Sequence, residues 1–167
     1  GLSPRLAGAL QALPEVDTAV GLGRGVAEVN GKGRALTVTD PIALERTFDL
    51  GTVRGSLRGL GTDGIAITRT EAEKQGLTTG DKARLTFTDG EKDDFTVRAV
   101  YGRSELAGDY VITRAAWAPH RTQDSDTVVA VSFKDGVSTG AGKAAVEKVA
   151  ARYGHPEVQT RDEYAQS

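Results

Sequence analysis

The segment from Gly136 to Lys143 is rich in glycine and ends in a lysine, as loops that cradle phosphate do. It lies between an expected strand and an expected helix, which is the setting of such a loop. A phosphate loop would need glycine at the position of Val137, and serine or threonine at the position of Ala144 to hold Mg²⁺. Because neither is present, the segment predicts a flexible start to a helix and no nucleotide site.

A second glycine-rich run, from Gly21 to Gly25, contains part of a dinucleotide-binding pattern. Val26 stands where the third glycine is needed, and a strand rather than a helix is expected to follow. Glycines that permit a bulge in a long strand explain the run more simply.

The residues Arg54 and Arg58 lie in a glycine-laced stretch and could meet an anionic group together with nearby backbone amides. The near-neutral charge of the chain favours the alternative that this stretch is a solvated loop. We take these two arginines and the aromatic side chain of Trp117 as candidate contacts for a ligand or partner: Arg54, Arg58 and Trp117. Such contacts would lie in a cleft between subdomains, a common place for binding sites.

The titratable residues suggest no catalytic or metal-binding set. His120 and His155 each lack a companion at the spacing of zinc ligands, and the chain has no cysteine. Four carboxylates crown one expected hairpin tip without the spacing of a calcium loop: Asp89, Glu91, Asp93 and Asp94. We therefore predict a protein that is not an enzyme, with no catalytic residue, metal or cofactor in this domain.

The overall composition is that of a folded protein without a strong net charge. The 167 residues include 21 Lys and Arg against 23 Asp and Glu, a formal net charge of −2. This balance gives no electrostatic drive toward nucleic acid or an anionic membrane surface. Hydrophobic residues make up 38%, which is enough for a buried core.

The N-terminal part predicts one helix and two strands. Ser3-Pro4 begins a short amphipathic helix that ends before Pro14. From Glu15 to Val29 the apolar period falls to two, which predicts one long, bent strand, and the turn at residues 30–33 leads into a returning strand. Asp40-Pro41 begins another short helix, and the glycine-laced stretch that follows, residues 51–64, is predicted to be loop.

The remaining elements include a hairpin and a C-terminal strand–helix–strand unit. Residues 83–99 alternate around an Asp89-Gly90 turn, as a half-buried hairpin requires. Residues 127–133 are apolar on both faces and predict a central strand. A helix is expected over residues 139–153, then a short strand at residues 157–160.

The ends of the chain thus predict an α+β fold with a split ferredoxin-like subdomain. We assign residues 1–45 and 125–167 to this α/β subdomain. Residues 46–124 form an inserted small, mostly β subdomain. One further strand before Leu2 would complete the ferredoxin-like unit, and without it we expect an unpaired edge beside the central strand.

Several motifs together resemble the extracytoplasmic domain of MacB-type, or FtsX-like, ABC transporter permeases. The resemblance spans nearly the whole chain and is most specific in its middle. It is carried by Leu2-Ser3, residues 12–16, Asp40-Pro41, Gly55-Ser56-Leu57, residues 64–68, residues 76–82, residues 97–101 and residues 158–163.

The resemblance implies a function without chemistry in this domain. The split subdomain would be the porter, and the domain would lie on the extracytoplasmic side of the cell membrane between two transmembrane helices of its own full-length chain. ATP would bind a separate cytoplasmic ABC ATPase, and this domain would couple ATPase-driven motion to export or extraction of a substrate, or to control of an extracytoplasmic partner. Such a partner could be a peptide, lipid, lipoprotein or cell-wall enzyme, and nucleic acid is not expected. The alternative is a free-standing ligand-binding module for a peptide or cell-wall glycan.

Overall fold

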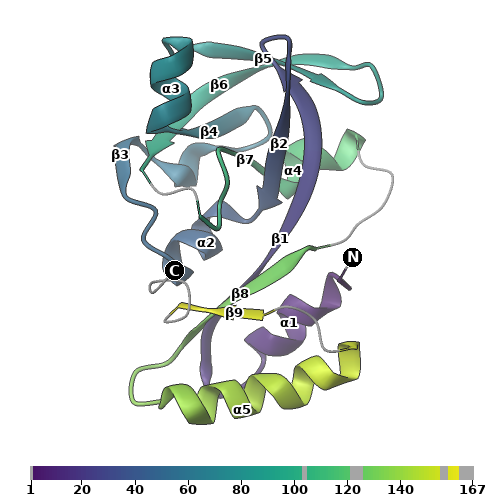
Figure 1. Ribbon diagram of the computed structural model, residues 1–167, viewed down its shortest axis with the longest axis vertical. Helices are drawn as coiled ribbons and strands as arrows, with labels where there is room; N and C mark the ends of the chain where they lie inside the picture. Colours follow the sequence, from purple (N-terminus) through teal and green to yellow (C-terminus); the bar gives the residue numbers. More distant parts are fainter. Residues whose placement is uncertain (1, 103–104, 121–125, 155–157, 162–167) are drawn as a thin grey trace.

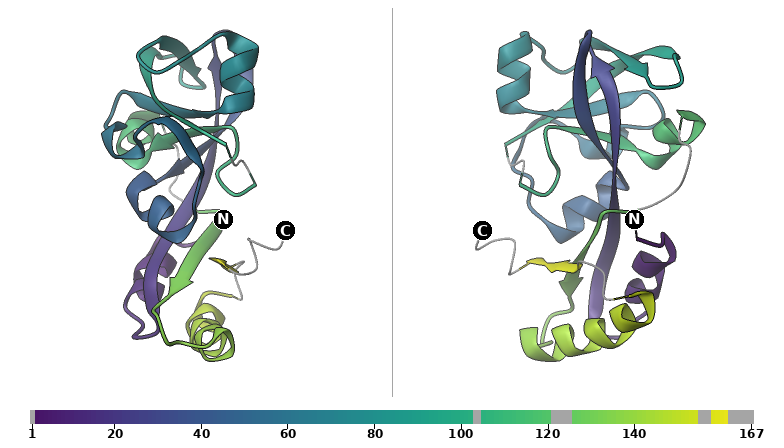
Figure 2. Two further views of the ribbon diagram at one scale, coloured as in Figure 1. Left: turned by 90° about the vertical axis from the view of Figure 1, so that its left-hand side faces the viewer. Right: turned by 45° about the vertical axis from the view of Figure 1, so that its right-hand side comes forward.

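The computed structural model describes residues 2–102, 105–120, 126–154 and 158–161 (Figure 1). A single long strand, β1 (Val16–Val29), runs through the molecule and joins an upper barrel to a lower layered part (Figures 1 and 2). The predicted long strand is confirmed, and its register shifts between Val16 and Thr18. The fold is α+β, as predicted, with a mixed sheet and helices packed on it.

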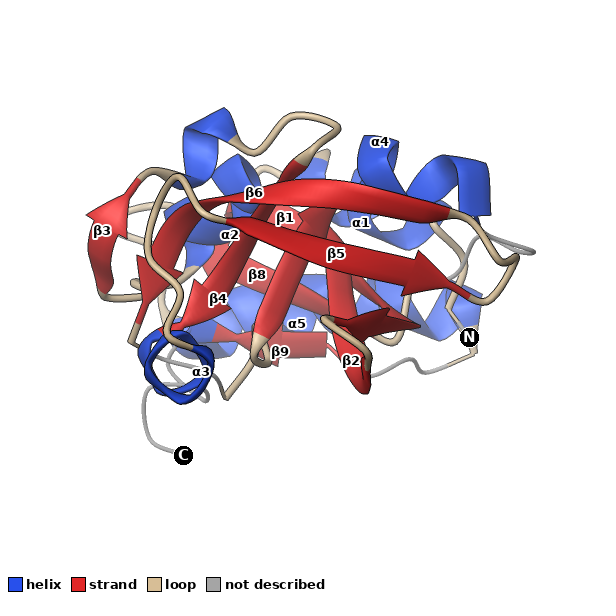
Figure 3. Ribbon diagram, turned by 90° about the horizontal axis from the view of Figure 1, so that it is seen from above, coloured by secondary structure: helices blue, strands red, loops and turns tan. Residues whose placement is uncertain are grey.

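The upper part is a closed barrel. The second half of β1 pairs with β2 (Lys32–Thr39) on one side and β5 (Lys82–Phe87) on the other. The circuit continues from β2 to β7 (Tyr110–Thr113), β4 (Gly64–Thr68) and β6 (Lys92–Tyr101), which pairs with β5 (Figure 3). The predicted hairpin is the β5–β6 pair, and it is confirmed.

The interior of the barrel is apolar and closed by helices. It holds Leu36, Ile65, Leu85, Val97 and Ile112, all completely buried. Helix α3 (Arg69–Gln75) packs against it, capped by the Thr68 hydroxyl and ended by Gly76 in the left-handed conformation. Helix α4 (Arg114–Trp117), followed by η2 (Ala118–His120), also contributes to this core.

The stretch that the sequence predicted as loop, residues 51–64, contains two short elements. Strand β3 (Thr52–Gly55) pairs with β6, and η1 (Leu57–Gly59) follows it. Together with α2 (Pro41–Thr47), η1 covers a second apolar cluster that includes Leu44, Leu57 and Leu60. The prediction failed here because a four-residue strand leaves little periodicity in the sequence.

The lower part is a small sheet covered by two helices. The first half of β1 pairs with β8 (Val128–Phe133), and β8 pairs in parallel with β9 (Val158–Thr160). Helices α1 (Arg5–Gln11) and α5 (Thr139–Ala150), the latter continued by η3 (Ala151–Tyr153), share one core with this sheet. Its buried members include Leu6, Leu10, Val129 and Val131.

Strand β8 is central, as predicted, but the expected unpaired edge beside it is wrong. In a complete ferredoxin-like sheet the first strand separates the strands that correspond to β8 and β9. Here β9 pairs directly with β8, with Val129 opposite Val158 and Val131 opposite Thr160. The backbone groups of β8 are therefore paired on both sides over this stretch.

The predicted boundaries at residues 45–46 and 124–125 stay a prediction. The strand pairing adds that β1 belongs to both parts and that β2 pairs within the barrel. Among the described residues, no helix has the length and apolar character required to cross a membrane.

Candidate ligand pocket

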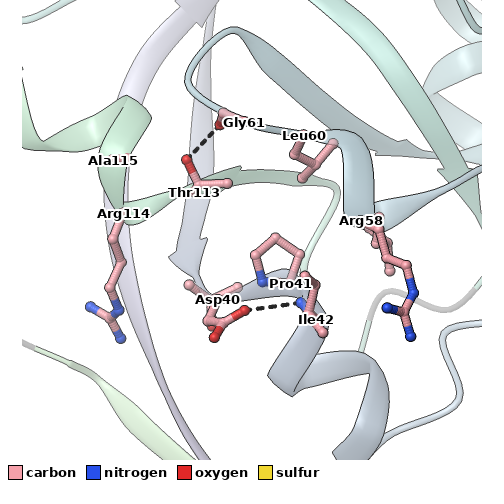
Figure 4. A pocket seen from close by; sticks show the side chains of 11 residues that line it. Asp40, Pro41, Ile42, Arg58, Leu60, Gly61, Thr113, Arg114 and Ala115 are labelled. Carbon is pink, nitrogen blue, oxygen red and sulfur yellow. Dashed lines mark hydrogen bonds between the residues drawn. The ribbon is translucent and has the colours of Figure 1, made fainter.

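A pocket of about 300 Å³ lies where three chain turns meet below the barrel (Figure 4). The turns are the start of α2, the η1 segment and the junction of β7 with α4. Its apolar lining includes Pro41, Ile42, Leu57 and Leu60. A concave, mostly apolar lining is typical of small-molecule sites.

Side-chain caps hold the turns that form this pocket. The carboxylate of Asp40 accepts hydrogen bonds from the N–H groups of Ile42 and Ala43, at 3.1 and 3.3 Å, and Pro41 supplies the helical φ. The Thr113 hydroxyl donates to the carbonyl of Gly61 at 2.8 Å and accepts from the N–H of Ala116. The pocket is thus built from helix starts fixed by local sequence.

Two arginines lie on opposite sides of the pocket (Figure 4). Arg58 is exposed, whereas Arg114 already binds the carbonyl of Gly21 and the carboxylate of Asp126. Arg58 is therefore the cation more accessible to an anionic group. The arrangement suits an apolar group that carries a negative charge, and none of the described residues that line the pocket is a serine, cysteine or histidine.

The structure does not bring the three predicted contact residues together. Arg58 lines this pocket, while Arg54 lines another groove beside β3 and donates to the Thr78 hydroxyl at 2.8 Å. Trp117 packs against the barrel core, with its ring 6.0 Å from that of Phe87. Their roles as ligand contacts stay a prediction.

In the Gly21–Gly25 run, Gly21 and Gly25 permit other side chains to pack closely against β1. The prediction that these glycines permit a bulge is therefore wrong. A Cβ atom at Gly21 would lie 2.0 Å from Oδ2 of Asp126, and one at Gly25 would lie 2.6 Å from the Trp117 ring. The register shift of β1 lies elsewhere, near Val16. These glycines let the carboxylate and the indole approach the strand.

The Gly136–Lys143 segment leads into α5 at Thr139, which confirms the predicted helix start, and its flexibility stays a prediction. Ser138 caps the helix by accepting from the N–H of Ala141 at 3.1 Å. Gly142 faces the ring of Phe133, and a Cβ atom there would lie 2.6 Å from a ring carbon. The glycine composition is thus explained in part by helix packing.

His120 has a partner that sequence reasoning missed. Its Nδ1 lies 2.7 Å from the carboxylate of Asp89, and its ring stacks on Phe87 with centroids 3.7 Å apart. The N–H of Glu91 and then His120 lower the pKa of Asp89. The pair fixes the hairpin tip against η2, whereas His155 lies outside the described residues.

In the parts of the chain that the structure describes, no group of three or more His, Asp or Glu side chains is arranged to hold a metal ion.

Solved structures of transporter domains share this fold. The periplasmic region of MacB from Actinobacillus actinomycetemcomitans has a TM-score of 0.70 at 12% identity, covering 99% of this chain and 82% of its own. The extracellular domain of the noncanonic ABC-type transporter YknZ from Gram-positive bacteria has a TM-score of 0.63 at 13% identity, covering 92% and 84%. A domain described as that of a permease protein from Porphyromonas gingivalis has a TM-score of 0.60 at 20% identity, covering 91% and 77%.

No protein-family model and no curated protein sequence matches the chain. The likeness in structure confirms the fold that the sequence motifs predicted.

Proposed function

We propose that this chain is the extracytoplasmic domain of an ABC transporter permease and that it transmits motion rather than performing chemistry. The observation that carries the proposal is the match to the MacB periplasmic region over 99% of this chain. The motifs at residues 64–68 and 76–82 support it from the sequence. In this proposal ATP binds a separate cytoplasmic ATPase, and this domain holds no cofactor.

Strand pairing suggests how motion would pass through the domain. Leu2 and Asp126 exchange backbone hydrogen bonds of 2.7 and 3.2 Å, and β9 pairs with β8. Leu2 therefore bridges to the residue two positions before β8, and β9 belongs to the lower sheet itself, so segments near both ends of the described chain are attached to this part. From there β1 continues without a break into the barrel, so displacement of the lower part is carried upward by a paired strand.

The first test is the full-length sequence. We expect an apolar span of about 20 residues on each side of this segment. If neither flank contains such a span, the proposal fails.

The second test measures motion in the full-length permease assembled with its ATPase. The 167 residues contain no cysteine, so cysteines introduced at Lys92 and Lys148, both exposed, can carry spin labels once any cysteine elsewhere in the permease and its ATPase is replaced. We expect distances between labels on the two permease copies to change when ATP is bound. Unchanged distances would contradict transmission of motion.

A second function, capture of a peptide or cell-wall glycan, has the apolar pocket and exposed Arg58 in its favour. Calorimetric titration with peptide antibiotics and cell-wall fragments tests it. Binding heat that is lost in Arg58→Ala would support capture of such a ligand. The absence of binding heat at millimolar ligand would exclude this function.

A further inference from the structure

We infer that the groove between β3 and α3 binds an extended, acidic segment of another polypeptide, which pairs with β3 as an additional strand. This interaction surface goes beyond the proposed function and does not depend on it. The groove has a volume of about 560 Å³ and is lined by Val53 and Arg54 from β3, Arg69 and Glu73 from α3, and Leu77 and Val100.

The first observation is the free backbone of β3. The pairings of the described strands give β3 one neighbour, β6, and the residues of β3 are all exposed. Thr52 pairs with Tyr101 and Arg54 with Val100, so Val53 is an extra residue outside the ladder. An edge strand with unpaired N–H and C=O groups is a template for strand addition.

The second observation is the mixed apolar and charged lining of the groove that β3 shares with α3 and β6. Val53 is 43% exposed, and only one other large hydrophobic side chain among the described residues, Val26, is comparably exposed. Val100 is buried, and Leu77 packs on the barrel core. A groove between an edge strand and a helix can accept alternate side chains of an added strand, which gives such sites their specificity.

The third observation is charge, which selects the occupant. Arg54 and Arg69 are both exposed, and among the described residues neither forms an ion pair with a carboxylate. Glu73 is the one acidic side chain among the described residues that line the groove. The surplus of positive charge favours an acidic segment. It disfavours a second copy of this chain, because pairing of β3 with itself would bring the arginines of both copies together.

The test uses capped peptides of about eight residues in which valine alternates with glutamate, glutamine or lysine. Fluorescence anisotropy of labelled peptides gives the affinity, and hydrogen exchange of the 167-residue chain gives the site. We expect the glutamate peptide to bind most tightly and to slow exchange of the backbone amides in β3. Methylation of alternate peptide N–H groups, which prevents strand pairing, should abolish binding.

Matched variants locate the surface. Val53→Glu places a negative charge in the groove and should weaken the glutamate peptide about tenfold. Val26→Glu introduces the same residue at the other exposed valine, on β1, and should leave the affinity unchanged. Arg69→Glu should reverse the preference toward the lysine peptide. Circular dichroism and thermal melting verify that each variant is folded.

Several results would overturn the inference. One is that none of the three peptides binds at millimolar concentration. Another is that the methylated glutamate peptide binds as tightly as the unmethylated one. A third is that Val26→Glu and Val53→Glu reduce the affinity for the glutamate peptide equally. Self-association through β3, seen by light scattering and lost in Val53→Glu, would replace the acidic partner with a second copy. All these measurements use the chain without a membrane or ATPase, so their failure is distinguishable from failure of the proposed transporter function.

Discussion

The guanidinium group of Arg114 donates a hydrogen bond of 2.8 Å to Oδ1 of Asp126, whose side chain is 1% exposed. The same arginine donates to the carbonyl of Gly21 at 2.7 Å. These bonds join the start of α4 to the middle of β1 and to the residue two positions before β8. The barrel and the lower sheet are therefore linked by a polar contact in addition to β1.

Loss of this arginine should destabilise the domain. Arg114→Met removes the partner of a buried carboxylate, and we expect a fall of about 2 kcal/mol in the free energy of unfolding. The value is below that for a fully buried pair because the Arg114 side chain is 38% exposed. Urea denaturation measures it. Arg84→Met breaks the exposed pair with Asp94 and is the control, with little expected change. Equal effects of the two variants would show that the Asp126 contact adds nothing.

A methyl group at Gly21 should have a similar effect for a steric reason. The Cβ atom of Gly21→Ala would lie 2.0 Å from Oδ2 of Asp126, so the carboxylate must move from its bond with Arg114. We expect a loss of about 2–3 kcal/mol by urea denaturation. Gly8→Ala is the matched control, since a Cβ there meets nothing within 4 Å and lies within helix α1. It should stabilise the chain by about 0.5–1 kcal/mol. A stable Gly21→Ala variant would contradict the close approach.

Much of the fold was predictable because its signals are local. Alternation marked β1 and the β5–β6 hairpin, and the side-chain caps at Asp40 and Ser138 begin α2 and α5 where the sequence indicated helices. Parallel pairings such as β4 with β6 were not predictable, because they join segments with no turn between them. The role of Gly21 was equally hidden, since its neighbour Asp126 lies far along the chain.

The candidate site was less predictable, and one glycine explains why. Arg54 and Arg58 are close in sequence, but Gly55 between them has φ +68 and the N–H of Ser56 bonds to the carbonyl of Arg98. The chain turns there, so the two arginines line different cavities. The importance of Val53 could have been suspected from the adjacent β-branched residues Thr52 and Val53 in an otherwise glycine-rich stretch.

Ionisation of Tyr110 should make stability depend on alkaline pH. Burial, followed by the hydrogen bond to Glu71, raises the pKa of Tyr110 to about 12. The unfolded tyrosine has a pKa of about 10. Because the folded value is the higher one, this contribution is fully present below pH about 10 and is lost as the pH rises toward 12.

The test compares wild type with Tyr110→Phe in urea from about pH 9 to about pH 11. Phenylalanine cannot ionise, so stability of the variant should fall less steeply with pH, although it is lower at neutral pH through loss of the 2.9 Å bond to Glu71. Tyr101, whose pKa burial also raises, is present in both proteins. Identical slopes would show that Tyr110 does not titrate differently in the folded state.

Removal of β9 should expose the edge of β8. A chain that ends at residue 157 lacks Val158–Thr160, the residues that pair with Val129–Val131. The uncovered N–H and C=O groups of an apolar strand favour association with another copy. We expect a lower melting temperature and a mass that rises with concentration in light scattering. A chain that ends at residue 161 keeps β9 and is the control, expected to remain monomeric at micromolar concentration. If both chains melt at the same temperature and stay monomeric, β9 does not protect the edge of β8.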